Sequence, residues 1–279
     1  MTDRLPFHRA AWRGGCVTAL LLLALALALL VALSLGRLRP EPLAAWWLRR
    51  LLTVLHIDVV WHGTRQPGAR MLVANHVSWL DIAVIGSRMP ARFIAKREVR
   101  DWPLIGWLAQ AAGTFFIRRG AGGAKSLVER LQPHMRGGGL VVLFPEGTTT
   151  DGRDVARFHA RLFDAAVATE SAVQPLALRY GGAHGAGIAP FIGDDTFVRH
   201  LGRVLRCPGM RVDATLPPAL APGADRATLC REAHARIRGI VLGEERAGHR
   251  TATASASVPS TDGGRARTET GLRRAGGTR

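Results

Sequence analysis

Two side chains in the first third of the chain, His76 and Asp81, are of the types that perform general-base catalysis. A carboxylate beside an imidazole fixes the tautomer of the ring and stabilises its protonated form. Residues with this spacing do not share one helical face, which needs a separation of three or four positions. We therefore expect His76 in a turn and Asp81 in the first turn of the helix that follows. The competing interpretation is a helix capped by Ser78, with His76 and Asp81 incidental to it.

A second candidate site is the turn Pro-Glu-Gly-Thr at residues 145–148, which follows an apolar run. Glu146 supplies a carboxylate, Gly147 permits close approach to the backbone, and Thr148 supplies a hydroxyl. An ordinary strand exit would account for the glycine but not for Glu146 beside a proline. These three residues are therefore candidate binding residues.

Arg118 and Arg119 stand at the end of another apolar run, which begins at Thr114. Arginine can bind a phosphate through two parallel hydrogen bonds. Adjacent arginines are also common on solvated faces, and by themselves these two favour that interpretation.

Short apolar runs alternate with helical patterns through the body of the chain. This alternation predicts an α/β fold with a mostly parallel central sheet flanked by helices. The expected strands are residues 71–74, 92–95, 114–117, 140–144, 173–178 and 211–216. The expected helices are residues 78–87, 104–111, 123–135, 155–169 and 225–242. In such sheets, sites form beyond the carboxyl ends of strands, which is where all three candidate groups fall.

Residues 16–35 carry no charged side chain and would form roughly 30 Å of helix, the thickness of a bilayer's hydrocarbon core. We expect a transmembrane helix there, after a basic flank at residues 1–15. A signal peptide is the alternative, but its apolar core is usually only about 7–15 residues long. Arginines flank the span on both sides, so they favour a cytoplasmic position of the following domain only slightly.

The other boundaries follow from composition. Residues 36–61 are expected to be an interfacial amphipathic segment that leads into a strand, because Arg49 and Arg50 oppose a second span while Trp46 and Trp47 suit the headgroup region. The folded domain is expected at residues 62–246. Residues 247–279 consist mainly of small residues, Thr and Arg, which predicts a disordered basic tail.

The charge balance limits the classes of partner. The chain has 38 Lys and Arg against 21 Asp and Glu, a net charge of +17, which attracts nucleic acid, anionic lipid or phosphorylated substrates. A single tyrosine and 6% aromatic residues argue against binding of single-stranded nucleic acid, which needs stacking surfaces. Three cysteines without metal-ligand spacing argue against a zinc module or a disulfide framework.

Four motifs together resemble the glycerolipid acyltransferase family, whose best-known members are 1-acylglycerol-3-phosphate acyltransferases. They occur in the family's order as N-H-x-x-x-x-D at residues 75–81, G-x-x-F-I-x-R at 113–119, F-P-E-G-T at 144–148 and the proline-bearing strand at 173–176. The resemblance implies that His76 is the base and Asp81 its partner. It implies that Arg119, Glu146 and Gly147 contact the acceptor headgroup, and it makes Asn75, Arg118 and Thr148 further candidates for substrate binding.

The implied reaction moves a fatty acyl group from acyl-CoA or acyl-carrier protein to the free hydroxyl of a lysophospholipid. Such a transfer needs a base and stabilisation of the developing oxyanion, but no acyl-enzyme nucleophile. No G-x-S-x-G, H-E-x-x-H, Walker or G-x-G-x-x-G motif occurs in the sequence, so we expect direct transfer without metal or nucleotide cofactor. We expect a bacterial inner-membrane enzyme with a cytoplasmic catalytic domain and no nucleic-acid partner.

One departure from the family pattern affects the acceptor. Many members have Arg-Ser after F-P-E-G-T, whereas this chain has Thr149 and Thr150, which weakens the prediction of a phosphate acceptor and favours a zwitterionic one. Residues 191–196 also resemble a bacterial branch that includes lyso-ornithine lipid acyltransferases. Lysophosphatidic acid remains the first expectation because Arg118 and Arg119 offer phosphate ligands, and lyso-ornithine lipid is the alternative. The alternative of another class is a membrane-tethered basic protein that binds anionic lipid or nucleic acid without catalysis.

Overall fold

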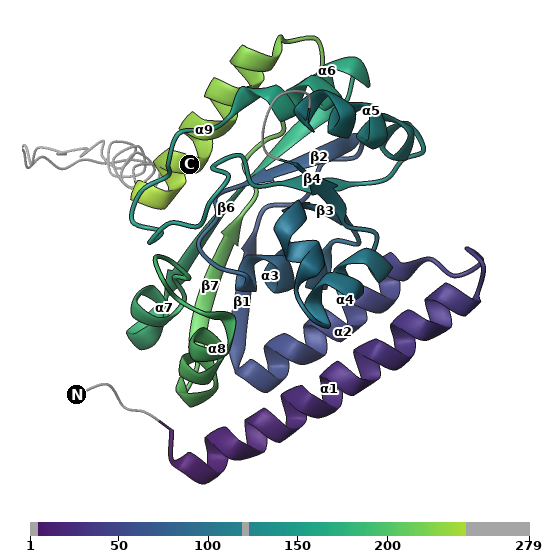
Figure 1. Ribbon diagram of the computed structural model, residues 1–279. Coiled ribbons are helices and arrows are strands. Elements are labelled where there is room, and N and C mark those ends of the chain that lie inside the picture. The colour runs from purple at the N-terminus through teal and green to yellow at the C-terminus, as the bar shows by residue number, and fades with distance from the viewer. Residues whose placement is uncertain (1–4, 119–122, 244–279) are drawn as a thin grey trace, which may run out of the picture. The chain divides into compact units, whose positions relative to one another are not determined.

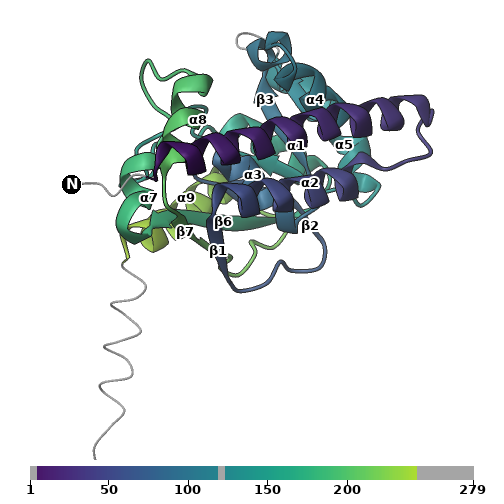
Figure 2. The ribbon, with the colours of Figure 1, turned by 90° about the horizontal axis from the view of Figure 1, so that it is seen from below.

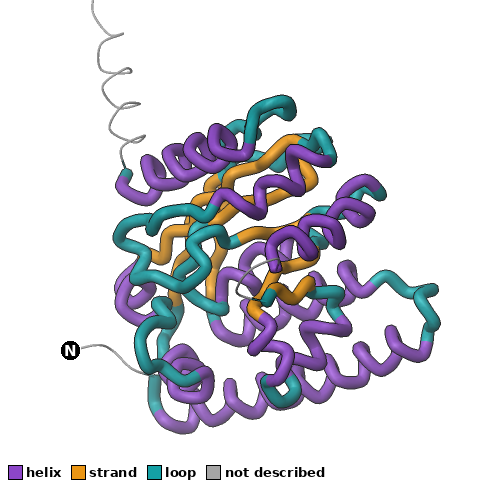
Figure 3. The backbone as a smooth tube through the Cα atoms, turned by 45° about the horizontal axis from the view of Figure 1, so that its top comes forward, coloured by secondary structure: helices purple, strands orange, loops and turns teal. Residues whose placement is uncertain are grey.

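The computed structural model describes residues 5–118 and 123–243, whose arrangement is shown in Figure 1. The first four residues, Arg119 and the predicted tail at 247–279 lie outside the described residues. The described chain forms a central β-sheet with helices on both faces (Figure 3). The predicted fold class is therefore confirmed.

The sheet has seven strands in the described chain, in the order β1-β7-β6-β2-β5-β3-β4. The strands are β1 (Ile57–His62), β2 (Ala69–Ala74), β3 (Arg92–Lys96), β4 (Phe115–Ile117), β5 (Val141–Leu143), β6 (Ala172–Gly181) and β7 (Met210–Thr215). Every neighbouring pair is parallel except β6 and β7. Consequently β2, β3, β4, β5 and β6 all end at the same edge of the sheet, as the prediction of a common site requires.

The helices pack on the sheet in two groups (Figure 1). They are α1 (Phe7–Leu33), α2 (Pro40–Leu55), α3 (Leu80–Arg88), α4 (Ile105–Ala111), α5 (Gly123–Arg136), α6 (Asp164–Ala168), α7 (Gly182–Ile188), α8 (Phe197–Arg206) and α9 (Arg226–Leu242), with short 3₁₀ helices η1 (Arg97–Asp101) and η2 (Ala160–Phe163). Buried residues of α2, α3 and α8 share one hydrophobic core, and those of α5, α6 and α9 share another.

The sheet separates these two cores because its central strands are buried on both faces. In β2, Leu72 and Ala74 belong to the core with α3, whereas Met71 and Val73 belong to the core with α9. Strands buried on both faces have continuous apolar sequences rather than alternating ones, as the short apolar runs predicted. The turn that begins at Asn75 is thus attached to the buried centre of the sheet.

Helix α1 begins earlier than the apolar run on which it was predicted. It starts at Phe7. In this added part the guanidinium of Arg13 is buried and donates hydrogen bonds to the carbonyls of Cys207 and Pro208. Farther along, the indole of Trp47 on α2 donates to the carbonyl of Leu20 at 2.6 Å. Figure 2 shows α1 lying along α2. By length and composition α1 could cross a membrane, and only a small share of its apolar window is buried.

Residues 36–61 were expected to lead into a strand, and that strand is β1, which begins at Ile57. Two other parts of the secondary structure differ from expectation. The helix expected at 155–169 is wrong for its first part, because the backbone amides of Ala156 and His159 bond to Glu146 and Pro145 instead of forming a helix. Helices α7 and α8 were not predicted.

Candidate active site

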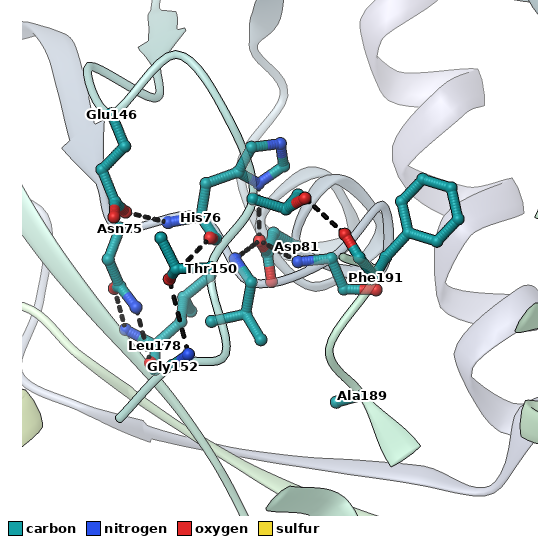
Figure 4. A network of polar contacts seen from close by, with 12 residues as sticks. Asn75, His76, Asp81, Glu146, Thr150, Gly152, Leu178, Ala189 and Phe191 are labelled. Atoms are coloured by element: carbon teal, nitrogen blue, oxygen red, sulfur yellow. Dashed lines mark hydrogen bonds and ion pairs between the residues drawn. The ribbon is translucent and has the colours of Figure 1, made fainter. Parts of the chain in front are cut away.

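His76 lies in the turn between β2 and α3, and its ring is fixed by Asp81 (Figure 4). Its Nδ1 lies 2.7 Å from Oδ2 of Asp81. Because a carboxylate can only accept, Nδ1 must carry the hydrogen, and the lone pair of the neutral ring is left on Nε2. Figure 4 shows this second nitrogen pointing away from Asp81. The pair thus has the arrangement of a general base and its orienting carboxylate.

Asp81 is fully buried and lies in the first turn of α3. Its Oδ2 also accepts the backbone amides of Val77 and Ser78, at 2.7 and 2.9 Å. Within the described chain the hydroxyl of Ser78 has no hydrogen-bond partner. The interpretation that Ser78 caps the helix is therefore wrong, because the carboxylate of Asp81 binds the amides of the turn.

The ring of His76 is held on one face by Phe144, the residue that follows β5. The ring centroids are 4.1 Å apart with an interplanar angle of 16°. The His76 side chain keeps 20% of its surface exposed, so it is both supported and accessible.

Glu146 connects the second candidate turn to the first. Its Oε1 accepts the backbone amide of His76 at 2.6 Å, and its Oε2 accepts that of Ala156 at 2.8 Å. Burial raises the pKa of Glu146 to about 7, against the two amide hydrogen bonds, which favour the charged form. Glu146 therefore braces the backbone of His76 and lies in a region where carboxyl ionisation is costly.

The remainder of the F-P-E-G-T loop is fixed by backbone contacts. Gly147 has φ +68°, a conformation that favours glycine, and both Gly147 and Thr148 are exposed. The amide of Thr150 donates to the carbonyl of His76 at 2.8 Å, and the hydroxyl of Thr149 donates to the carbonyl of Phe191. Thr149 and Thr150, which stand where many family members have Arg-Ser, therefore hold the loop through one hydroxyl and one backbone amide.

A cleft of about 1630 Å³ crosses the edge of the sheet where the parallel strands end. His76, Glu146, Gly147, Thr148 and Arg118 all line it. Apolar side chains in its wall include Val17, Leu21, Trp47, Leu48, Leu51, Ile82, Phe197 and Leu201. Basic side chains include Lys96, Arg157, His159, Arg161, Arg226, Arg231 and His234. His76 thus opens into a space whose wall carries both apolar and basic side chains.

Two candidates are placed differently. Asn75 does not line the cleft: its amide group is buried, accepts the backbone N–H of Leu178 at 2.8 Å and donates to the carbonyl of the same residue at 3.0 Å. It joins the ends of β2 and β6, and its expected contact with substrate stays a prediction. The expected role of Arg119 cannot be described, because Arg119 lies outside the described residues.

Two residues of the site were not found from the sequence. Phe144 was identified only as part of a motif, and Tyr180, whose hydroxyl contacts Asp81, was not proposed as a site residue. The signal for Tyr180 was its place just beyond the apolar core of β6, where the rule for parallel sheets expects site residues. Its partner Asp81, however, lies on α3, far from Tyr180 in the chain, so this contact could not be predicted from residue spacing.

The described residues contain no group of three or more His, Cys, Asp or Glu side chains placed to hold a metal ion. What they do contain is an imidazole with a free nitrogen in a mixed apolar and basic cleft. Such an arrangement can remove a proton from a hydroxyl whose lipid chain lies in the same space.

Comparison with known proteins decides the family. A family model described as Acyltransferase matches residues 58–179. A lyso-ornithine lipid O-acyltransferase from Pseudomonas aeruginosa is 44% identical over 206 residues, which are 73% of this chain and 80% of that protein. The chain belongs to the glycerolipid acyltransferase family. It is an O-acyltransferase of the lysophospholipid type, and the resemblance drawn from its motifs is confirmed.

A second relative supports this assignment, and a solved structure shares the fold. A 1-acyl-sn-glycerol-3-phosphate acyltransferase from Neisseria meningitidis is 34% identical over 179 residues, covering 63% of this chain and 70% of that protein. The crystal structure of the 1-acyl-sn-glycerophosphate acyltransferase PlsC from Thermotoga maritima matches with a TM-score of 0.62. That match has 21% identity and covers 83% of this chain and 94% of the PlsC chain. It shows that the fold is shared.

The geometry of His76 predicts that His76→Ala reduces acyl transfer by about 10²–10⁴, the usual effect of losing a general base. Asp81→Asn should also cause a severe loss, because the ring loses control of its tautomer. His62→Ala is a matched control, since His62 lies 2.8 Å from Asp213 in a second His–Asp pair that does not line the cleft. Initial rates of folded variants test this, and near-normal turnover by His76→Ala would exclude the assignment.

The raised pKa of Glu146 predicts a pH-dependent stability. A carboxyl whose pKa rises from 4.5 to about 7 on folding stabilises the protein fully below about pH 4.5, and this contribution is lost as the pH rises through about 7. Wild type should therefore lose stability relative to Glu146→Gln between about pH 5 and pH 8, by up to about 3 kcal/mol. A hydrogen bond that is lost in the variant is lost at about pH 5 and at about pH 8 alike. Urea unfolding curves of wild type and variant, measured at both ends of this range, therefore isolate the effect of ionisation. A difference that is constant with pH would contradict the prediction.

Proposed function

We propose that the enzyme transfers an acyl group from a thioester to the hydroxyl of a lysolipid with His76 as general base. The observation that carries this proposal is the bond from Nδ1 of His76 to Asp81, which leaves Nε2 available in the cleft. The acceptor hydroxyl gives its proton to Nε2 while its oxygen attacks the thioester carbonyl. The carbon–sulfur bond then breaks, and the leaving thiolate takes the proton.

We propose lyso-ornithine lipid as the acceptor. The relative from Pseudomonas aeruginosa carries that name, and its similarity extends over most of both chains. The loop supports the same choice, because Thr149 and Thr150 bond to backbone carbonyls where many family members offer an arginine. A zwitterionic headgroup needs less positive charge at that position than a phosphate does.

Lysophosphatidic acid was the first expectation from the sequence motifs, and it is here the second candidate acceptor. The relative from Neisseria meningitidis is named for that substrate. Arg118, at the end of β4, lines the cleft and can pair with a phosphate. The two acceptors therefore differ in their expected dependence on Arg118.

The donor in this proposal is acyl-CoA or acyl-carrier protein. Both carry a phosphate on the arm that ends in the thioester, and the wall formed by Arg157, Arg161 and Arg231 suits that charge. The reaction needs no metal or nucleotide cofactor beyond this donor, and a nucleic-acid partner is not part of the proposal.

We propose that α1 anchors the enzyme in the bacterial inner membrane with the catalytic domain in the cytoplasm. Leu22, Leu29 and Leu33 on α1 are exposed, and exposed leucines on a helix of this length favour lipid over water. The apolar part of the cleft includes Val17 and Leu21 from the same helix. A lipid substrate in the bilayer would then lie next to the cleft.

A lysolipid panel tests the acceptor. Wild type should acylate lyso-ornithine lipid faster than lysophosphatidic acid, and Arg118→Gln should raise KM about tenfold or more for lysophosphatidic acid alone. Arg153→Gln is a matched control, because Arg153 is exposed and does not line the cleft. Both donors are supplied in separate assays. Activity with lysophosphatidic acid only would refute the first acceptor, and activity with no lysolipid would refute the proposed function.

Membrane anchoring predicts that the full chain resists extraction by alkaline carbonate. Replacing Leu22 and Leu29 together by Asp should release the protein, since each charge at the centre of a span costs about 2.5–3.5 kcal/mol. Leu242→Asp, on an exposed leucine of α9, is the control for the effect of a surface charge. Recovery of wild type in the soluble fraction, with an N-terminus beyond residue 35, would show a cleaved signal peptide instead.

A further inference from the structure

The carboxylate of Asp81 has two oxygens, and each has a different set of partners. Oδ2 receives the imidazole of His76 and the amides of Val77 and Ser78. Oδ1 receives the hydroxyl of Tyr180 at 2.6 Å. Because a carboxylate only accepts, the phenol is the donor in this bond. The bond therefore continues the His76–Asp81 pair to a third side chain.

Tyr180 reaches Asp81 because β2 and β6 are parallel neighbours that end at the same edge of the sheet. The cross-link between Asn75 and Leu178 holds these two strand ends together. On its other side Tyr180 is paired with Val212 of β7. The backbone of Tyr180 is thus fixed from both neighbouring strands, and its phenol has little freedom to leave Asp81.

The phenol stays protonated at neutral pH. Burial, followed by the negative charge of Asp81, raises the pKa of Tyr180 well above its ordinary value. The hydroxyl is therefore a permanent donor, unlike a histidine in the same place. It fixes the rotation of the carboxylate about its last bond and satisfies an oxygen that would otherwise be buried without a partner.

We propose that Tyr180 is a positioning residue of the acyl-transfer site, which sets the carboxylate of Asp81 so that Oδ2 faces the imidazole. This inference rests on the proposed function of His76 as base. Tyr180 does not touch the substrate: it acts through Asp81. Losing the hydroxyl should therefore lower kcat while leaving KM for both substrates unchanged.

The first test is Tyr180→Phe, which keeps the ring and removes only the hydroxyl. Hydrogen bonds to charged groups are strong enough that we expect kcat to fall about ten- to a hundred-fold. Ser87→Ala is the matched control, because it removes another buried hydroxyl from the α3 region, one that bonds to the carbonyl of Val84. Unchanged kcat in Tyr180→Phe, or an equal loss in Ser87→Ala, would overturn the proposal.

A second test keeps the fold intact if Tyr180→Phe fails to fold. Tyr180 is the single tyrosine of the chain, so biosynthetic incorporation of fluorotyrosine labels one site. The fluorine NMR signal of the full-length protein should titrate at lower pH in Asp81→Asn than in the parent, because the negative charge beside the phenol is gone. A signal and a titration unaffected by Asp81→Asn would show that the bond does not form in solution.

Fluorination also links the bond to turnover. More highly fluorinated tyrosines are more acidic, and an ionised phenol can no longer donate to Asp81. The alkaline loss of kcat should therefore move to lower pH in step with the fluorine titration. If the loss of kcat at high pH does not shift with fluorination, the proposal is overturned. If His76→Ala is active, the proposed function is overturned, but the measured bond between Tyr180 and Asp81 remains.

Discussion

A carboxylate that is completely removed from water must find donors for its oxygens, and Asp81 meets this constraint in a way that organises the whole site. Its partners come from two places: the turn after β2, which supplies two backbone amides and the ring of His76, and β6, which supplies the hydroxyl of Tyr180. Through Asp81 the turn is therefore bonded to both α3 and β6. The arrangement of His76 and Asp81 is a product of the assembled sheet, and not of a local sequence motif alone.

The loop after β5 contributes to the same assembly through its backbone. Glu146 accepts the amide of His76, and Thr150 donates its own amide to the carbonyl of His76. Phe144 covers one face of the ring. His76 is thus held by its main chain, by Nδ1 and by one ring face, which leaves Nε2 as the ring nitrogen that points away from Asp81 (Figure 4). Burial of Glu146 is the cost of this arrangement, and it appears as a raised pKa.

How much the sequence could predict depended on whether a contact was local or crossed the sheet. The pairing of His76 with Asp81 and the central parallel strands followed from spacing and from apolar runs, because both depend on residues close in the chain. The contact of Tyr180 with Asp81 and the use of Asn75 as a link between strands depend on which strands are neighbours. The segment at 155–169 was expected to be helical, but the amide of Ala156 donates a hydrogen bond to Glu146 instead. Tertiary hydrogen bonds there override a local helical pattern.

Backbone contacts among the loops at the strand ends make the position of the imidazole independent of the exposed side chains in the cleft. Carbonyl and amide groups fix the loops: Thr150 bonds to His76, and the amide of Phe191 donates to the carbonyl of Val77 at 3.0 Å. Side chains such as Thr148 are exposed in the cleft and do not set the position of the imidazole. Substitutions at such positions can change the surface of the cleft without moving the imidazole. One scaffold can in this way give rise to enzymes for different membrane lipids through few substitutions.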